Sequence, residues 1–312
     1  NHEQATVYFD GPAGSHVSIS PDGLMIVSCV DSAYVGKGAA PAMVYRSDDG
    51  GLLRELKTDE CITSAAFSST GEYIVTTSAP VPASSPRNAA PMSEAPVLWE
   101  AASGKKLKTL SGMMTRMAHP TMFSPSRDSL VLSRENDAAV CSVPAGDAQL
   151  VLRGHTQRVT YAEFSPDGDR ILTVSDDGTV RIWSSTEGIE VRPPIPWNAP
   201  GSESVQAAFT AGSGDVVVTD RNGVSLFATE LHAEASADAK FTSRHMYAAV
   251  SRSHDHVALF SRIQNIVSVV SSRTFSPICE LELSERPQEV LFHPAEKQLL
   301  AICQNRMFQY RS

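Results

Sequence analysis

The sequence lacks the segments that direct a chain into or across a membrane. None of its apolar runs approaches the roughly 20 residues of a membrane helix, and no basic, then apolar, then small-residue leader is present. Its five cysteines include no CxxC pair, and no Asn-x-Ser/Thr acceptor for N-glycosylation occurs. We therefore expect a cytoplasmic or nuclear protein with reduced thiols, and neither a secreted protein nor one bound to a membrane.

Positive charge is also scarce. Asp and Glu outnumber Lys and Arg by 35 to 26, which gives a formal net charge of −9, and the basic residues form no runs. Neutralisation of phosphates by Lys and Arg drives nonspecific binding of nucleic acids, so the composition argues against DNA or RNA as the main ligand.

Motifs of the common catalytic sites are missing. The sequence has no GxxxxGK phosphate loop, no GxSxG elbow, no HExxH and no two Cys/His pairs at zinc spacing. His254, Asp255 and His256 are adjacent possible ligands, but they fall in an expected turn, whereas a metal needs ligands that converge from separate strands. We predict no catalytic residue, no cofactor and no metal site.

What the sequence does contain is one strong pattern in residues 153–184, RGHTQRVTYAEFSPDGDRILTVSDDGTVRIWS. Residues 159–164 alternate with a period of two and stop at the Ser-Pro-Asp-Gly turn 165–168. A second strand, 170–175, ends in the hairpin signal Asp-Asp-Gly, and a third, 179–183, follows at once. The segment therefore predicts three short antiparallel strands.

This segment resembles a WD40 repeat. Gly154 and His155 match the Gly-His pair before the first strand of such a repeat, and Trp183 matches the Trp of its closing Trp-Asp pair, although Ser184 replaces the Asp. The resemblance implies a four-stranded blade of a propeller. It also implies a buried hydrogen-bond network of these residues: His155, Asp177, the indole of Trp183, and either Thr173 or Ser175. The alternative, a catalytic His155–Asp177 dyad, is not needed to explain the two residues.

Because one blade cannot bury both of its faces, the repeat requires neighbours. The residue before each Ser-Pro-Asp-Gly-like turn serves as a marker, and the seven markers are Ile19, Phe67, Phe123, Phe164, Phe209, Val250 and Phe292. Their separations are 48, 56, 41, 45, 41 and 42 residues, close to the WD40 period of about 40–45. Third strands are expected after them at 42–46, 96–100, 138–143, 180–183, 223–227, 265–270 and 306–310.

These repeats predict an all-β fold, a seven-bladed WD40 β-propeller with four antiparallel strands per blade, as a single domain over residues 1–312. The expected blades are 11–58, 59–111, 112–153, 154–196, 197–238, 239–284, and 285–312 together with 1–10. The seventh blade has three strands of its own, and strand 5–9 precedes the first marker. We predict that this N-terminal strand completes blade seven and closes the ring.

Two long insertions interrupt the repeats. Residues 31–41 and 79–95 separate the second and third strands of blades one and two, and the latter segment is rich in proline. WD40 geometry places both insertions on the face that carries the Gly-His loop. They are either tolerated mobile loops or part of a binding surface.

The same face is mapped by the residues that lie six positions before each marker, where the chain enters the innermost strands. They include Arg158, Arg244 and Arg286, together with Glu203 and Met117. The three arginines would favour an acidic or phosphorylated segment through bidentate pairing, or they are solvated rim charges. Met117 belongs to a methionine cluster that forms either adaptable surface or core. Trp197, in a proline-rich crossing, is a binding anchor or packs on blade four.

We interpret the chain as a non-catalytic scaffold or adaptor that presents this face to proteins or peptides. One alternative is a single propeller of a longer cytoskeletal or ciliary scaffold, because the chain starts at Asn1 and stops flush with the last strand. The other is an enzyme with a site in the central channel, for which one carboxylate among the seven positions is too few. Composition does not indicate an oligomeric state.

Overall fold

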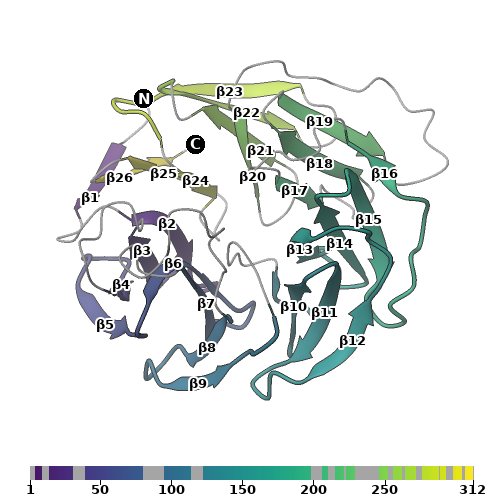
Figure 1. Cartoon of the computed structure of the whole chain (residues 1–312). Helices are drawn as coiled ribbons and strands as arrows, with labels where there is room; N and C mark the ends of the chain where they lie inside the picture. The colour runs from purple at the N-terminus through teal and green to yellow at the C-terminus, as the bar shows by residue number, and fades with distance from the viewer. Residues whose placement is uncertain are drawn as a thin grey trace, which may run out of the picture.

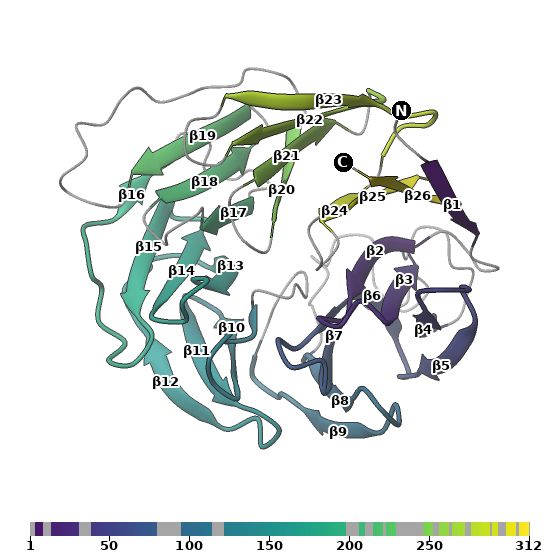
Figure 2. The same cartoon turned by 180° about the vertical axis from the view of Figure 1, so that it is seen from behind.

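The computed structural model describes these residues of the chain: 4–8, 14–30, 39–79, 95–113, 122–197, 206–209, 215–220, 223–228, 246–251, 256–261, 264–271, 276–287, 289–292, 298–303 and 306–311. Their regular structure is β-strand, arranged in small antiparallel sheets that follow one another around a common centre (Figure 1). The view from behind shows the same arrangement (Figure 2). None of the helical segments in this described part is long and apolar enough to cross a membrane. The fold is an all-β propeller.

The described residues form seven sheets, which we number in chain order. The first contains β2 (Gly14–Ile19), β3 (Met25–Val30), β4 (Ala42–Arg46) and β5 (Leu52–Leu56). The second contains β6 (Cys61–Phe67), β7 (Tyr73–Ala79), β8 (Val97–Glu100) and β9 (Lys106–Thr109). The third contains β10 (Ser129–Arg134), β11 (Asp137–Ser142) and β12 (Ala148–Leu152). The fourth contains β13 (Val159–Phe164), β14 (Arg170–Ser175), β15 (Thr179–Ser184) and the short β16 (Ile195–Pro196).

The remaining sheets come from the C-terminal part of the chain. The fifth contains β17 (Gln206–Phe209), β18 (Asp215–Asp220) and β19 (Gly223–Ala228). The sixth contains β20 (Met246–Val250), β21 (His256–Ser261), β22 (Ile266–Ser271) and β23 (Pro277–Glu282). The seventh contains β24 (Glu289–Phe292), β25 (Gln298–Cys303), β26 (Arg306–Arg311) and the N-terminal β1 (Gln4–Tyr8). In Figure 1, β6, β13, β17 and β20 lie toward the centre, and β5, β9, β12 and β23 lie at the outside.

The sequence markers coincide with strand ends. Six of the seven are the last residue of a strand, and the other, Phe123, forms an isolated bridge with Leu130. Glycines with positive φ, Gly23, Gly71 and Gly168, occupy the turns that follow three of these strands. Only glycine adopts such a φ without steric cost, so in these three sheets the turn sequence determines where the first strand ends.

The N-terminal strand closes the seventh sheet. β1 pairs with β26 in antiparallel register, from Gln4 opposite Tyr310 to Tyr8 opposite Arg306. The sheet order is therefore β1-β26-β25-β24, and β24 in turn contacts β2 of the first sheet. The N-terminal strand thus pairs as expected with the last strand, one residue earlier than predicted, and it covers the outer edge of β26.

Apolar cores fill the seams between successive sheets. Between the first and second sheets, Val27 and Val44 pack with Ile62, Ile74 and Trp99. The seam between the third and fourth sheets contains Val131, Val140, Leu152, Phe164, Ile171 and Trp183, among others. In both of these seams, the apolar faces of the two neighbouring sheets are buried against each other.

Antiparallel order within the sheets defines two rims. The turns that follow first and third strands, such as 165–168 and 184–188, form what we call the lower rim. The upper rim contains the segments where the chain enters a first strand, such as 154–158, and the links from second to third strands, such as 175–179. The insertions lie in such links of the first two sheets, and their segments 31–38 and 80–94 fall outside the described residues.

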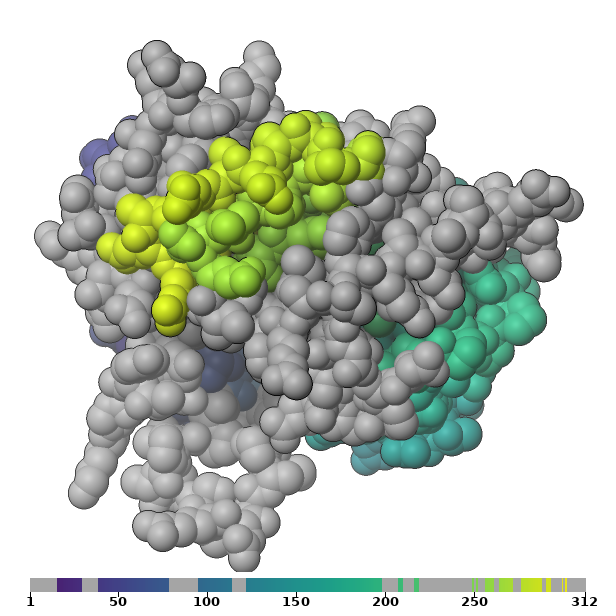
Figure 3. Space-filling model, turned by 90° about the horizontal axis from the view of Figure 1, so that it is seen from above, coloured from purple at the N-terminus to yellow at the C-terminus, as the bar shows by residue number. Residues whose placement is uncertain are grey.

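The outer strand of the sixth sheet is more exposed than the outer strands β5, β9 and β12. β23 keeps one buried residue, Leu281, while Ile278 is 52% exposed. Figure 3 shows this strand in yellow beside the green β22 on the outer surface of the ring. Charged residues Glu280 and Glu282 lie on the same strand, and charges on an edge strand disfavour pairing with another chain.

Candidate interaction surface

The upper rim of the fourth sheet is organised by a buried chain of hydrogen bonds. The indole Nε1–H of Trp183 donates to Thr173 Oγ1 at 2.8 Å. The Thr173 hydroxyl donates to His155 Nε2 at 2.8 Å, and His155 Nδ1–H donates to Asp177 Oδ2 at 2.8 Å. We assign these directions because an indole only donates and a carboxylate only accepts, so a single neutral tautomer of His155 satisfies every member.

Burial of His155 has an electrostatic consequence. Burial lowers the pKa of His155 from its usual 6.5, while the hydrogen bond and charge of Asp177 act in the opposite direction. A protonated ring would also have to donate from Nε2, where the Thr173 hydroxyl already supplies a proton. The histidine is therefore neutral at pH 7 and serves as a connector between strands.

Asp177 links the hairpin turn to the segment that leads into β13. It accepts hydrogen bonds from the backbone N–H of Thr156 at 3.0 Å and of Thr179 at 2.9 Å, and from the Thr179 hydroxyl at 2.6 Å. Burial alone would raise its pKa, but the bonds from Thr179, Thr156 and His155 together lower it to about 2. Its charge is thus retained at all physiological pH values.

The choice between Thr173 and Ser175 is settled by the geometry. Thr173, with no exposed surface, joins His155 to Trp183, whereas Ser175 donates to the carbonyl of Gln157 at 2.9 Å. Ser175 also accepts from the backbone N–H of Asp177 at 3.1 Å, so it supports the turn instead. All five predicted network residues therefore lie together, as a structural unit of the fourth sheet.

Arg158 lies at the upper rim, and Asp176 positions its side chain. Its Nε and Nη2 each lie 3.3 Å from Asp176 Oδ2, and 42% of its side chain is exposed. The backbone is held on both sides: Asp176 N–H donates to the Arg158 carbonyl at 2.9 Å, and Val159 N–H donates to the carbonyl of Glu135 at 2.8 Å. Glu135 belongs to the third sheet, so this bond also ties two sheets together at the upper rim.

The other predicted rim residues are distributed differently. Arg286 is exposed, after the outer strand β23 and before β24. Arg244, Glu203 and Met117 lie outside the described residues, as do His254 and Asp255. Within the described part of the chain, no three His, Cys, Asp or Glu side chains are grouped so that they could hold a metal ion.

Trp197 does not form an exposed anchor, which corrects that part of the expectation. Only 6% of it is exposed, and it packs with Val180, Ile195 and Ala207 in the seam between the fourth and fifth sheets. The reason is the short strand β16, which pairs Ile195 with Val180, after which Trp197 N–H bonds to the carbonyl of Gly178 at 2.9 Å. This pairing turns the indole inward, so Trp197 belongs to the core.

One contact between sheets was not predicted from the sequence. Glu163 is 2% exposed, and its Oε1 accepts the backbone N–H of Phe209 in the fifth sheet at 2.8 Å, while Oε2 accepts the Tyr161 hydroxyl at 3.1 Å. An equivalent bond joins the first two sheets, where Ser18 Oγ accepts the backbone N–H of Phe67 at 3.3 Å. Ser18, like Glu163, directly precedes a marker residue. The sequence does show a carboxylate directly before the marker Phe164. Its hydrogen-bond partner could not be predicted, because that partner belongs to the neighbouring sheet.

Comparison with known proteins agrees with this geometry. Residues 146–184 match the family described as "WD domain, G-beta repeat" (WD40). The chain is 33% identical over 96 residues to the DENN domain and WD repeat-containing protein SCD1 of Arabidopsis thaliana, which covers 29% of the chain and 8% of the relative. It is 44% identical over 43 residues to the human WD repeat-containing protein 86, covering 14% of the chain and 11% of the relative.

A third relative is the Lissencephaly-1 homolog 1 of Paramecium tetraurelia, 36% identical over 56 residues, or 18% of the chain and 14% of the relative. In each case the matched segment spans less than a sixth of the relative's length. The likeness therefore concerns repeats and not whole proteins. Together, the family match and the hydrogen-bond network identify residues 146–184 as a WD40 repeat within an all-β propeller.

Proposed function

We propose that the protein is a non-catalytic scaffold whose seven sheets are the blades of one closed propeller, and that its upper rim binds a peptide or protein segment. WD-repeat proteins generally act in protein interactions, which supports this class of function. The bound segment is acidic or phosphorylated, because the residue that the rim presents best is an arginine.

The observation that carries the proposal is the placement of Arg158. Asp176 holds its guanidinium at 3.3 Å through Nε and Nη2, which leaves Nη1 with no partner among the described residues. The His155 network and the bond between Val159 and Glu135 make the backbone beneath it rigid. A pre-positioned guanidinium loses little side-chain entropy on binding a carboxylate or phosphate.

Arg158→Gln tests this role without placing a second negative charge beside Asp176. Its matched control is Arg46→Gln: Arg46 pairs with Asp49 at 2.6 Å, is 48% exposed, and lies at the lower rim of the first sheet. Wild type, both variants and an Arg158, Arg244 and Arg286 triple reversal to Glu are used to capture proteins from cell extract, and the captured proteins are quantified by mass spectrometry.

We expect one set of proteins to be depleted with Arg158→Gln and lost with the triple reversal, and to be retained with Arg46→Gln. Far-ultraviolet circular dichroism verifies that every variant is folded. Equal recovery of all proteins with the wild type and the triple reversal would contradict a binding role of the upper rim.

A further inference from the structure

Basic side chains cross two seams of the ring at the lower rim. Arg54 in β5 donates to the backbone carbonyls of Ala101 and Ala102 in the second sheet. Lys108 in β9 donates to the carbonyl of Ala145 and pairs with Asp147 at 2.9 Å in the third sheet. Both β5 and β9 thus place a cation over the turn of the following sheet, and the cation fills the seam at the lower rim.

The seam between the third and fourth sheets lacks this crossing. In the first two sheets the cation lies two positions before a buried leucine, as Arg54 does before Leu56 and Lys108 before Leu110. In β12 the buried leucine is Leu152, so the position of the cation is occupied by Leu150. Leu150 instead packs against Gly188, where an added Cβ would lie 2.9 Å from its Cδ1.

The turn of the fourth sheet is left open as a result. No hydrogen bond from any described residue reaches the backbone carbonyls of Ser185 and Thr186, which correspond to Ala101 and Ala102 of the second sheet. Two acceptors that receive hydrogen bonds at the first seam therefore have no donor among the described residues at this one.

The third sheet also differs from the first, second and fourth sheets in the turn that precedes β10. The turns after β2, β6 and β13 have a glycine with positive φ at their fourth position, Gly23, Gly71 and Gly168. The corresponding turn of the third sheet has Arg127 there. Arg127 is exposed and forms no ion pair with any described residue, so its charge is free to pair with a ligand.

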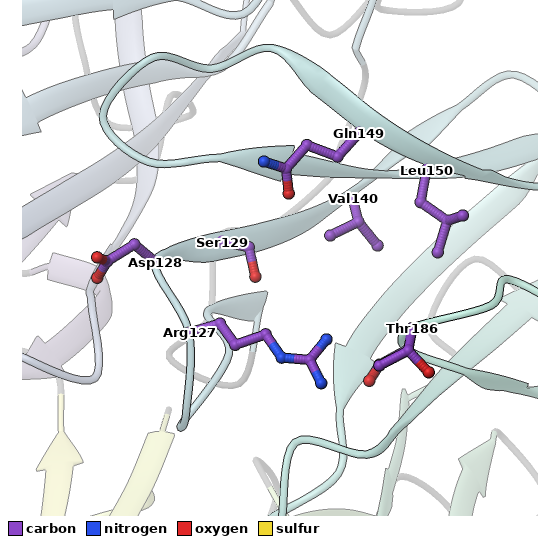
Figure 4. A pocket seen from close by; sticks show the side chains of 8 residues that line it. Arg127, Asp128, Ser129, Val140, Gln149, Leu150 and Thr186 are labelled. Atoms are coloured by element: carbon purple, nitrogen blue, oxygen red, sulfur yellow. The ribbon is translucent and has the colours of Figure 1, made fainter.

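Arg127 and Leu150 both line one cavity of about 440 Å³ between the third and fourth sheets. Figure 4 shows the Arg127 side chain extending through it toward Thr186, while Asp128 points away. Val140 and Leu150 point into the cavity from the opposite wall, near Gln149. The cavity thus combines one cation without an ion pair, two backbone carbonyls without a donor among the described residues, and an apolar wall.

We propose that this cavity binds an acidic peptide segment of a partner protein, in which a carboxylate side chain is flanked by an aliphatic residue. The carboxylate pairs with Arg127, the peptide N–H groups bond to the carbonyls of Ser185 and Thr186, and the aliphatic side chain packs on Val140 and Leu150. A free inorganic anion would engage only Arg127, whereas a peptide supplies the donors and the apolar group as well. The site lies on the lower rim and is independent of Arg158.

The probe is a phage-displayed library of random short peptides, selected on the wild-type chain and counter-selected on Arg127→Glu. We expect enrichment of peptides with Asp or Glu next to Leu, Ile or Val. A fluorescein-labelled copy of the most enriched peptide, followed by anisotropy, should bind Arg127→Glu about tenfold or more weakly. Arg127→Lys, which keeps the charge but not the planar fork, should give an intermediate affinity.

Leu150→Arg provides a variant that fills the site and retains the fold. It restores the cation found at this position in β5 and β9, so it should close the seam, keep the thermal midpoint at or above that of wild type, and abolish peptide binding. Arg158→Gln should bind the same peptide with wild-type affinity, so failure of the upper-rim proposal would not affect this result. Selection of peptides without acidic residues, or equal affinity for wild type, Arg127→Glu and Leu150→Arg, would overturn the proposal.

Discussion

The indole nitrogen of Trp183 lies 2.8 Å from the hydroxyl oxygen of Thr173, and both side chains are buried in the fourth sheet. This bond has a counterpart in the second sheet, where Trp99 Nε1 donates to Thr76 Oγ1 at 2.8 Å. The two pairs differ in one respect, because Thr173 also donates to His155. A pair of matched substitutions can therefore separate the contribution of the histidine from that of the tryptophan.

Thr173→Val should destabilise the protein more than Thr76→Val. Valine has the shape of threonine, so the first variant orphans two buried groups, the Trp183 N–H and His155 Nε2, and the second orphans only the Trp99 N–H. Each orphaned group costs about 1–3 kcal/mol, so the loss of unfolding free energy should be roughly twice as large for Thr173→Val. Denaturant titration measures both, and equal losses would show that His155 contributes nothing through this bond.

The network should also make stability depend on pH. Because the pKa of His155 is lowered in the folded state, the unfolded chain binds the proton more tightly, and stability falls as the pH drops below about 6.5. Asp177, whose pKa is lowered from 3.8 to about 2, adds a second loss between these two values. Both contributions are fully present above pH 6.5.

His155→Gln isolates the first of these steps, since the chain has nine histidines in all. Thermal midpoints of wild type and variant are measured from pH 8 to pH 5, and their difference should shrink as the pH falls. A difference that stays constant over this range would mean that the pKa of His155 is the same in the folded and unfolded chains.

Glu163 should be needed as a hydrogen-bond acceptor between the fourth and fifth sheets. Glu163→Ala leaves the buried N–H of Phe209 without its acceptor, at a cost of about 1–3 kcal/mol, whereas Glu163→Gln keeps an oxygen in place and should cost less. Chemical unfolding monitored by tryptophan fluorescence measures both. If the Gln and Ala variants lose the same stability, the acceptor role is refuted.

Deletion of residues 1–8 should destabilise the whole domain. It removes β1, exposes the N–H and C=O groups along β26, and opens the ring at the seventh sheet. We expect a single melting transition at a lower temperature, together with a tendency to associate through the open edge. Deletion of residues 1–3, which leaves all of β1, is the control, and unchanged melting of the longer deletion would contradict closure by this strand.

Local features of the sequence predicted much of the strand pattern. The turn sequences placed the markers, from Ile19 to Phe292, at the ends of first strands, because proline and glycine restrict or permit particular φ values regardless of what surrounds them. The His155 network was predictable from its resemblance to a known repeat. The choice of Thr173 over Ser175 was not, since both residues lie on one face of β14 and only their distances to His155 separate them.

Contacts across the seams could not be predicted in the same way. Trp197 was compatible with either an exposed or a buried position until β16 paired with β15 and directed it inward. Arg127 and Leu150 are 23 residues apart and unremarkable in sequence, yet they border one cavity. The sequence by itself determined where most strands and turns lie, because these depend on local backbone preferences and side-chain alternation. Only the tertiary structure decided which residues meet between sheets, because that depends on how separate apolar faces pack.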